Sequence, residues 1–469
     1  MNLATRSILP FSGDQSPTAT LRRYVVLAAV LAAGFAAVAC SDEGATGPPT
    51  VQRLPDSSGV YSEVFSDPEA ACKGCHPTHY EEWSISMHAY SFVDPVFFRL
   101  NEIGQERSNG QLGSFCTDCH SPIASRLGEI PPNTPEASLS KLARAGVSCD
   151  VCHKAESWRP GHAIDGFRLD DAQIGTIQDP MPNGFHSSRY EADFARSGVC
   201  EGCHDIVNPL GVRVERTSTE HDASLYPGQG IFCQTCHMLT YTGQAAIGAP
   251  QRGNLHRHTM AGVDVPLTDF PGRDRMIDLV EQQLTRSITL TVNAPTETTR
   301  SEDVRILVDV FNTNAGHSIP SGSVFERQMW VEVIARDADT GEELYTSGTL
   351  DPNGDLLDEN SDFVKSGDLQ PDLDLALFNG IPKKNGETTS FFWEAHEIVF
   401  RIIPALEGRT SIYNIPAQQL EGVDRVTLDV RVLFRAFPPH FLRKIDLPEL
   451  VERVPQFTMD EYQTEIQVL

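Results

Sequence analysis

Cys72-Lys-Gly-Cys75-His76 is the first of five copies of one pattern, in which two cysteines three positions apart are followed at once by a histidine. The other copies are Cys116-Thr-Asp-Cys119-His120, Cys149-Asp-Val-Cys152-His153, Cys200-Glu-Gly-Cys203-His204 and Cys233-Gln-Thr-Cys236-His237. Ten of the eleven cysteines belong to these motifs, and no cysteine follows Cys236 in a chain of 469 residues. The chain therefore divides into a cysteine-rich first half and a second half without cysteine.

This motif is the attachment signature of c-type haem. Its two thiols project from one side of a helical turn and can add to the vinyl groups of a porphyrin, while the histidine becomes the proximal iron ligand. Disulfides would leave the recurrent histidines unexplained, and redox-active dithiols do not come in fives. Zinc sites usually combine two cysteine pairs, so five pairs would leave one over. We therefore expect five covalently attached haems, with His76, His120, His153, His204 and His237 as metal ligands.

The second axial ligand of each iron decides the chemistry, because a second histidine makes an electron carrier and an open face admits a reacting molecule. His88 lies twelve residues after His76, about 18 Å along a helix, so we expect it to bind a neighbouring haem. His256 and His258 would share a face if their stretch were a strand. We prefer His258 because Met260-Ala-Gly262 follows it.

Two further ligands are expected at loops. His317 is bracketed by Gly316 and Pro320, which indicates a shaped loop of the kind that often carries function. His186 precedes an expected helix over 187–197. The fifth distal ligand stays open between His162, which we place first, and two others, His221 and His79. His396 and His440 are assigned to packing or the surface.

The N-terminus predicts export and anchoring. Arg22 and Arg23 precede an apolar run from Tyr24 to Ala39, which has the length of a signal-peptide core. The small residues before Cys40 resemble a bacterial lipobox, so we expect residues 1–39 to be a lipoprotein signal peptide and Cys40 the lipidated residue; an ordinary cleavage site is the alternative. Residues 40–66 read as a flexible linker. Ser41 favours outer-membrane sorting, and the location expected is periplasmic or cell-surface.

The formal charge of -27 excludes nucleic acid as a partner, because phosphates demand a basic surface. Beyond residue 285 the hydrophobic pattern changes to period two, clearest at Val426, Leu428, Val430 and Val432. This alternation predicts an antiparallel β-sandwich. The fold class expected is α+β: a mostly helical or irregular haem domain over 67–270, a connecting helix over 271–285 and a sandwich over 286–469. Asp351-Pro-Asn-Gly-Asp355 is typical of a turn, with calcium as the weaker alternative.

The chain resembles the multihaem cytochrome c family related to the tetrahaem cytochromes of nitrifying bacteria. The similarity spans about residues 67–440 and implies His88, His186, His258 and His317 as distal ligands, with a β-domain packed on the haem module. His221 stands where similar proteins often carry tryptophan. The segments that carry the resemblance are Cys72–His76 with Tyr80, Trp83, Ser86 and His88, Gly146–His153, Cys233–Met238, His256–Gly262, Gly316–Gly322 with Arg327 and Trp330, and Phe434–Pro439.

These observations favour an exported, lipid-anchored pentahaem cytochrome that transfers electrons through mostly bis-histidine haems. Its partners would be other cytochromes or quinol-linked membrane complexes. The alternative is an oxidoreductase that acts on nitrite, hydroxylamine or a similar small molecule at one open haem, and it depends on the unassigned fifth ligand. A third hypothesis is a surface module whose haems stack between subunits.

Overall fold

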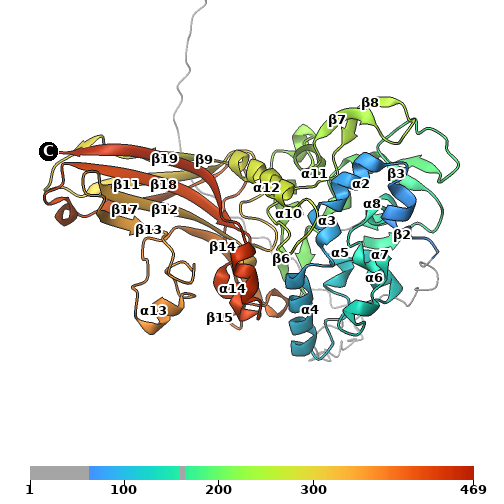
Figure 1. Ribbon diagram of the computed structural model, residues 1–469, viewed down its shortest axis with the longest axis horizontal. Helices are drawn as coiled ribbons and strands as arrows, with labels where there is room; N and C mark the ends of the chain where they lie inside the picture. The colour runs from blue at the N-terminus through green and yellow to red at the C-terminus, as the bar shows by residue number, and fades with distance from the viewer. Residues whose placement is uncertain (1–62, 159–163) are drawn as a thin grey trace, which may run out of the picture. The chain divides into compact units, whose positions relative to one another are not determined.

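The computed structural model describes residues 63–158 and 164–469. Cys40, His162 and the expected signal peptide lie outside the described residues. The described part begins with short helices and ends with long strands, as the sequence predicts (Figure 1). No helix within it is long and apolar enough to cross a membrane.

The first half is built from short helices separated by loops. Proline stands at the first position of several of them, where its missing N–H costs nothing. Pro95 opens the longest of these helices, and the Asp94 side chain caps it by accepting a hydrogen bond from the backbone N–H of Val96. The helices are η1 (Pro68–Cys72), α2 (Pro77–Ser84), α3 (Met87–Tyr90), α4 (Pro95–Arg107), α5 (Thr117–His120), α6 (Pro122–Leu127), η2 (Glu136–Ser138), α7 (Lys141–Arg144), α8 (Cys149–His153), η3 (Ala192–Ala195), α9 (Gly198–Glu201), α10 (Thr217–Asp222), η4 (Pro227–Gln229) and α11 (Cys233–His237).

Four small strand pairs lie between these helices. They are β1 (Ala155–Trp158) with β2 (Ile164–Phe167), β3 (Gln173–Gly175) with β4 (Ser188–Tyr190), β5 (Ile206–Val207) with β6 (Arg213–Glu215), and β7 (Thr240–Gln244) with β8 (Gln251–His256). The helix expected over 187–197 is wrong. Residues 188–190 instead pair with β3 in parallel, and only the one-turn helix η3 follows. Backbone pairing with a distant strand has overridden the local helical pattern.

The second half contains two sheets. The larger has the strand order β10 (Glu297–Thr298), β19 (Phe457–Val468), β18 (Arg425–Arg435), β12 (Gln328–Asp337), β14 (Leu377–Lys384) and β15 (Glu387–Thr388), with β13 (Glu343–Ser347) on β12 and β16 (Glu397–Arg401) on β14. The smaller has the order β17 (Gly408–Ile415), β11 (Val304–Asn312) and β9 (Ile288–Asn293). Apart from the short β10, the pairs are antiparallel. The remaining elements are α12 (Arg273–Ser287), η5 (Val324–Glu326), α13 (Asp362–Ser366), η6 (Phe392–Glu394), η7 (Ala417–Leu420), α14 (Pro439–Lys444) and η8 (Pro448–Arg453).

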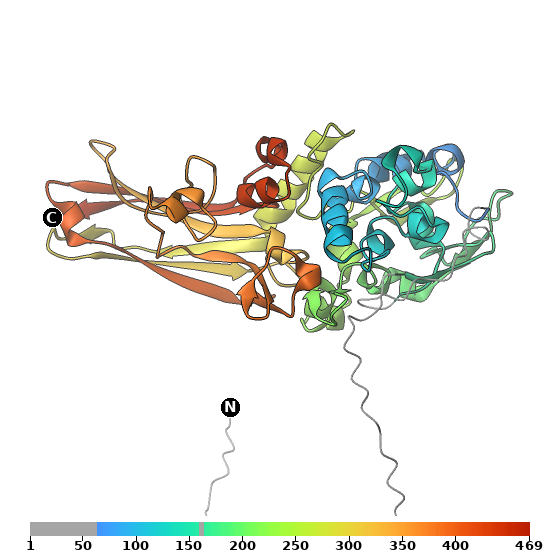
Figure 2. The ribbon, with the colours of Figure 1, turned by 90° about the horizontal axis from the view of Figure 1, so that it is seen from below.

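The two sheets pack face to face over one apolar core. Alternate residues of β11 and β18, such as Val308 and Leu428, are fully buried between the layers that Figure 2 shows. Trp330 on β12 is also fully buried and donates its indole N–H to the carbonyl oxygen of Gly348 at 2.9 Å. Period-two alternation places every second side chain on the inner face. This packing confirms the α+β prediction with a C-terminal sandwich.

The sandwich also contacts the first half. Ile103 on α4 and Leu112 after it belong to the same apolar core as the strands. A side chain on Gly104 would collide with Leu112, and the Trp393 indole ring packs against the same position. Arg99 donates to the carbonyl oxygen of Ile445 at 3.0 Å. These contacts pack α4 against the sandwich.

The Asp351 loop forms a turn. One carboxylate oxygen of Asp351 accepts the backbone N–H groups of Asn353 and Asp355 at 2.8 and 2.9 Å, and the other accepts the Ser361 hydroxyl at 2.6 Å. The Asp355 carboxylate pairs with the Arg443 guanidinium. Carboxylates used in this way cap a turn.

The sandwich core supports a direct stability prediction. Leu428→Ala should lower the free energy of unfolding of the sandwich by about 2–5 kcal/mol, because it leaves a cavity in a close-packed core. Leu373→Ala is the matched control, since Leu373 is 91% exposed and Leu428 fully buried. The control should change the free energy by less than about 0.5 kcal/mol. Urea unfolding followed by far-ultraviolet circular dichroism measures both, and equal effects would contradict the assigned core.

Candidate haem sites

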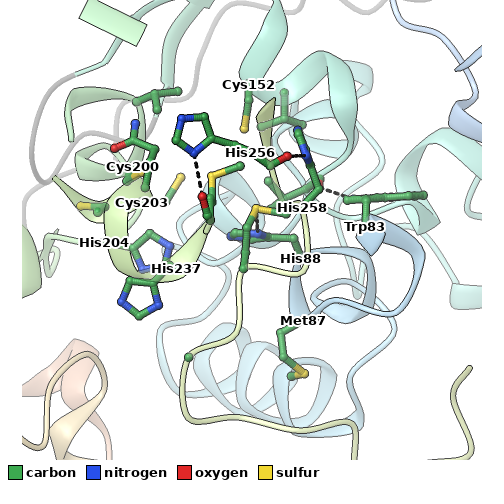
Figure 3. A pocket seen from close by; sticks show the side chains of 18 of the residues that line it. Trp83, Met87, His88, Cys152, Cys200, Cys203, His204, His237, His256 and His258 are labelled. Carbon is green, nitrogen blue, oxygen red and sulfur yellow. Dashed lines mark hydrogen bonds between the residues drawn. The ribbon is translucent and has the colours of Figure 1, made fainter. Parts of the chain in front are cut away.

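All five motifs line one continuous cavity of about 1830 Å³. Sites for drug-sized molecules usually enclose about 300–1,000 Å³, so this cavity exceeds what one small ligand requires. Every motif cysteine and every motif histidine lies on its wall. Figure 3 shows part of this wall, with Cys200, Cys203 and His204 on one segment and His237 beside them.

Each motif forms a helical turn. In the first, second and fourth motifs the histidine N–H donates to the carbonyl of the first cysteine, at 2.8, 3.1 and 3.0 Å. The third and fifth motifs are the helices α8 and α11 themselves. This local winding brings two thiols and one imidazole to the same side of the backbone, as thioether attachment requires.

Backbone carbonyl oxygens orient four of the five motif histidines. The acceptors of the Nδ1–H groups of His76, His120, His153 and His237 are the carbonyls of Ala245 at 2.6 Å, Ser91 at 3.0 Å, Ile174 at 2.7 Å and Ala261 at 2.7 Å. A histidine that donates from Nδ1 keeps the Nε2 lone pair for a metal. Among the described residues, nothing hydrogen-bonds to the ring of His204.

Four motif histidines face a second histidine ring. An imidazole nitrogen lies about 2.0–2.1 Å from a bound metal and about 1.1 Å from its own ring centre, so two imidazoles on opposite sides of one ion have ring centres about 6.3 Å apart. The observed separations match this value. They are 6.3 Å for His76–His186, 6.3 Å for His153–His258, 6.1 Å for His204–His88 and 6.4 Å for His237–His317. Each of these pairs can therefore hold one haem iron.

His88 faces the fourth motif. Its ring lies on α3, just beyond the short α2 helix that follows the first motif. Its Nδ1–H points to the Met260 sulfur at 3.0 Å, with Met260 in a left-handed conformation (φ 46°). Burial lowers the pKa of His88 to about 3 and that of His204 to about 4, so both rings are neutral at pH 7. Neutral imidazole is the form that binds metal.

His186 and His258 face the first and third motifs. The Asn183 side chain accepts the backbone N–H groups of Phe185 and His186, and this turn replaces the expected helix as the support of His186. The strand β8 ends at His256, so His258 lies beyond it and the two residues do not share a strand face. The His256 ring donates to the Met238 carbonyl oxygen at 2.7 Å. Burial lowers the pKa of His258 to about 3.

His317 reaches the fifth motif from the sandwich. Its loop is held by Asn312, whose side-chain amide donates to the His317 carbonyl at 2.9 Å. The Glu220 carboxylate on α10 accepts the backbone N–H of Ser318 and the Ser321 hydroxyl, at 3.2 and 3.1 Å. Burial lowers the pKa of His317 to about 4. Residues from both halves therefore build this site.

His120 differs from the other four motif histidines. Its ring stacks on Phe97 at 4.4 Å, and no histidine among the described residues makes a ring contact with it. Neither of the two described candidates for a fifth distal ligand makes a ring contact with His120; the His79 ring instead lies 6.2 Å from His76 and 4.6 Å from His258. The His79 Nε2 atom lies 3.1 Å from the Tyr241 hydroxyl, and the His221 Nε2 atom lies 3.1 Å from the Ile231 carbonyl oxygen.

The cavity wall also carries ionisable residues for which the sequence offered no motif. Asp94, Glu215, Asp264 and the adjacent pair Glu326 and Arg327 come from four places along the chain that share no spacing. Of these residues, only Arg327 belongs to the segments that carry the family resemblance. Their proximity depends on how α4, β6 and η5 pack together, which no local pattern encodes.

The facing rings support a prediction about spin state. His258→Ala should convert one haem from low spin to high spin, because the iron on His153 would lose the ring that faces it. The matched control is His256→Ala, two residues away, whose ring makes no ring contact with a motif histidine among the described residues. Electron paramagnetic resonance of the oxidised protein measures the change. Equal spectra for the two variants would exclude His258 as a ligand.

Comparison with known proteins agrees with this site. Residues 71–154 match the family described as "Cytochrome c554 and c-prime", a range that includes the first three motifs. No curated protein matches the chain. The match, together with the site, supports a multihaem c-type cytochrome that binds haem covalently and acts in electron transfer or redox chemistry.

Proposed function

We propose that the protein is an exported, lipid-anchored pentahaem cytochrome that carries electrons through four bis-histidine haems. The fifth haem, at His120, would have no second histidine from the described residues. The observation that carries this proposal is the set of four facing histidine pairs, with ring centres 6.1–6.4 Å apart. Six-coordinate haem with two histidines gives a low-spin site suited to electron transfer rather than to substrate binding.

The neighbouring motifs form a connected set, which supports transfer from haem to haem. The thiols of Cys72 and Cys149 interact, which places the first and third motifs side by side. The fourth motif adjoins two others, through Cys119–Cys203 and Cys200–Cys233. Cys203 also acts electrostatically on Cys152, which links the third motif to the fourth. Every motif thus has a neighbour.

The protein's own contribution is to fix the ligands and exclude water. Backbone carbonyls hold the proximal rings in one tautomer, and burial keeps the distal rings neutral. A dry, low-dielectric surrounding also sets how strongly each nearby charge acts on a site. These are the means by which a protein tunes a bound haem.

A second function is supported at the motif Cys116–His120. The His120 ring faces no histidine among the described residues, so a haem bound there would keep one axial position for a small molecule. Reduction of nitrite, hydroxylamine or a similar molecule would draw its electrons from the other four haems. This candidate function is compatible with electron transfer, because the fifth haem would be the site at which the transferred electrons reach a substrate.

Spectra of the oxidised holoprotein test both functions. We expect five haems per chain by mass and by pyridine haemochrome, of which four are low spin and one is high spin. Five low-spin haems would overturn the second candidate and leave the carrier. Two or more high-spin haems would contradict the histidine pairs.

The anchor is proposed on Cys40, which lies outside the described residues. Cys40→Ser should move the protein from the membrane pellet to the soluble fraction, because stable anchoring needs the acyl chains that the thiol and its amino group carry. Ser41→Ala is the matched control and should stay in the pellet. Detergent partitioning measures the difference. A Cys40→Ser variant that still pellets would exclude lipidation as the anchor.

A further inference from the structure

Five ionisable side chains line the cavity that contains the motifs. Asp94 caps α4, Glu215 ends β6, Asp264 follows the loop after His258, and Glu326 and Arg327 stand at the end of η5. Glu215, Glu326 and Arg327 are buried. Buried charges are rare unless they are paired or have a function, so the cluster requires an explanation.

Arg327 has N–H donors without a hydrogen-bond partner among the described residues. Its side chain is 7% exposed. One terminal nitrogen donates to the Asp264 carboxylate at 2.7 Å, and the other donates to the Ala436 carbonyl oxygen at 3.0 Å. Its Nε–H has no partner among the described residues. A guanidinium carries five N–H groups, so these two bonds leave three for another acceptor. Leaving a buried donor unpaired costs about 1–3 kcal/mol, which indicates a ligand with acceptor atoms.

The buried position of the Glu326 side chain favours its protonated form. It is 7% exposed, and no hydrogen bond to its side chain occurs among the described residues. Burial raises its pKa to about 8, although the Arg327 charge opposes the shift; Glu215, Asp264 and Asp94 act in the same direction as burial. Burial also raises the pKa of Asp94 to about 7. At neutral pH Glu326 is therefore mostly protonated and can donate a hydrogen bond, whereas Asp94 is about half ionised.

The cluster adjoins the motif that has no facing histidine. The Asp264 charge acts on the His120 ring, and Glu215 acts on Cys119. The Arg327 guanidinium also lies over the Phe437 ring at 5.4 Å, which fixes its orientation in an apolar wall. Arg327 and the buried acids therefore belong to the part of the cavity wall whose charges act on the second motif.

We propose that this cluster is a binding site for a small anion beside the haem of Cys116, Cys119 and His120, with Arg327 holding the anion and Glu326 supplying a proton to it. In that transfer the carboxyl O–H bond of Glu326 breaks, an O–H or N–H bond forms on the anion, and the resulting carboxylate pairs with Arg327. The inference rests on the second function proposed above and names the residues that would serve it.

The competing explanation is that Arg327 pairs with a carboxylate of the porphyrin itself. Arginine binds carboxylates in bidentate fashion, and a bound haem carries such groups. The two explanations differ in what Arg327 changes: an anion site controls the affinity for added anions, whereas a porphyrin contact controls the haem potential alone.

Nitrite titration of the oxidised holoprotein, followed in the high-spin optical band, separates them. Nitrite is fully anionic above pH 6, so its own charge stays constant. Arg327→Gln should weaken binding at least about tenfold, equivalent to about 1.4 kcal/mol. Arg327→Lys should recover part of the lost affinity, because lysine restores the positive charge but not the planar set of guanidinium N–H donors. Arg409→Gln is the matched control, since Arg409 is exposed on β17.

Glu326→Gln provides an independent readout. In the wild type, nitrite affinity should fall as pH rises through about 8, because deprotonated Glu326 repels the anion. Glutamine is neutral at every pH, so the variant should lose this fall. Glutamine also keeps the shape of the glutamate side chain. The Glu326→Gln variant therefore still tests the anion site if the Arg327→Gln variant fails to incorporate haem.

Three outcomes are distinguishable. A protein without a high-spin haem would end the second function and this inference together. A high-spin haem that binds nitrite with the same affinity and pH dependence in all variants would overturn this inference alone. An Arg327→Gln variant with a shifted reduction potential and unchanged nitrite affinity would assign Arg327 to the porphyrin carboxylate instead.

Discussion

The constraint on which the first half depends is the distance between facing histidine rings, 6.1–6.4 Å in four pairs, which is the separation that one iron between them would require. Each facing pair joins a motif to a segment far along the chain: His76 to His186, His153 to His258, His204 to His88 and His237 to His317. If each pair holds an iron as proposed, a misplacement of about 1 Å would break a coordination bond of about 2 Å. Loops with little regular structure are therefore held by side-chain caps, such as Asn183 under His186 and Asn312 under His317.

The two halves differ in how they obtain a core. The sandwich has one large apolar core made by its own strands. Around the motifs, the buried apolar residues instead form small clusters of five or six at the edge of a cavity. Short helices of four to eight residues bury little surface by themselves. Covalently attached porphyrins would supply the missing apolar contacts, so that folding of this half and cofactor attachment are one process.

The sandwich does more than support the haem half. The segment between β11 and β12 carries His317 to the fifth motif, and its residues Glu326 and Arg327 line the same cavity as the motifs. Its anchors reach across the halves, for example through Glu220 on α10 and Asp264 after the His258 loop. The segment between Asn312 and Gln328 thus contributes both to a facing histidine pair and to the cluster of ionisable side chains on the cavity wall. Rigid strands on both sides hold it in place.

The sequence alone determined the features that depend on neighbours in the chain. The five motifs identify covalent haem because thiols and imidazole act together within one helical turn. The strands of the sandwich follow from period-two alternation at residues such as Val426 and Leu428. His88, His186, His258 and His317 could be selected from their local settings and the family resemblance, but not matched to particular motifs.

The tertiary structure decided what depends on distance through space. It placed His88 opposite His204 rather than opposite another motif, and it put Phe97 against His120. It replaced the expected helix after His186 with a strand paired to β3. It also gathered Asp94, Glu326 and Arg327 from positions with no common pattern. Such juxtapositions arise from the packing of whole elements, and a local pattern carries no information about which distant segment will lie opposite it.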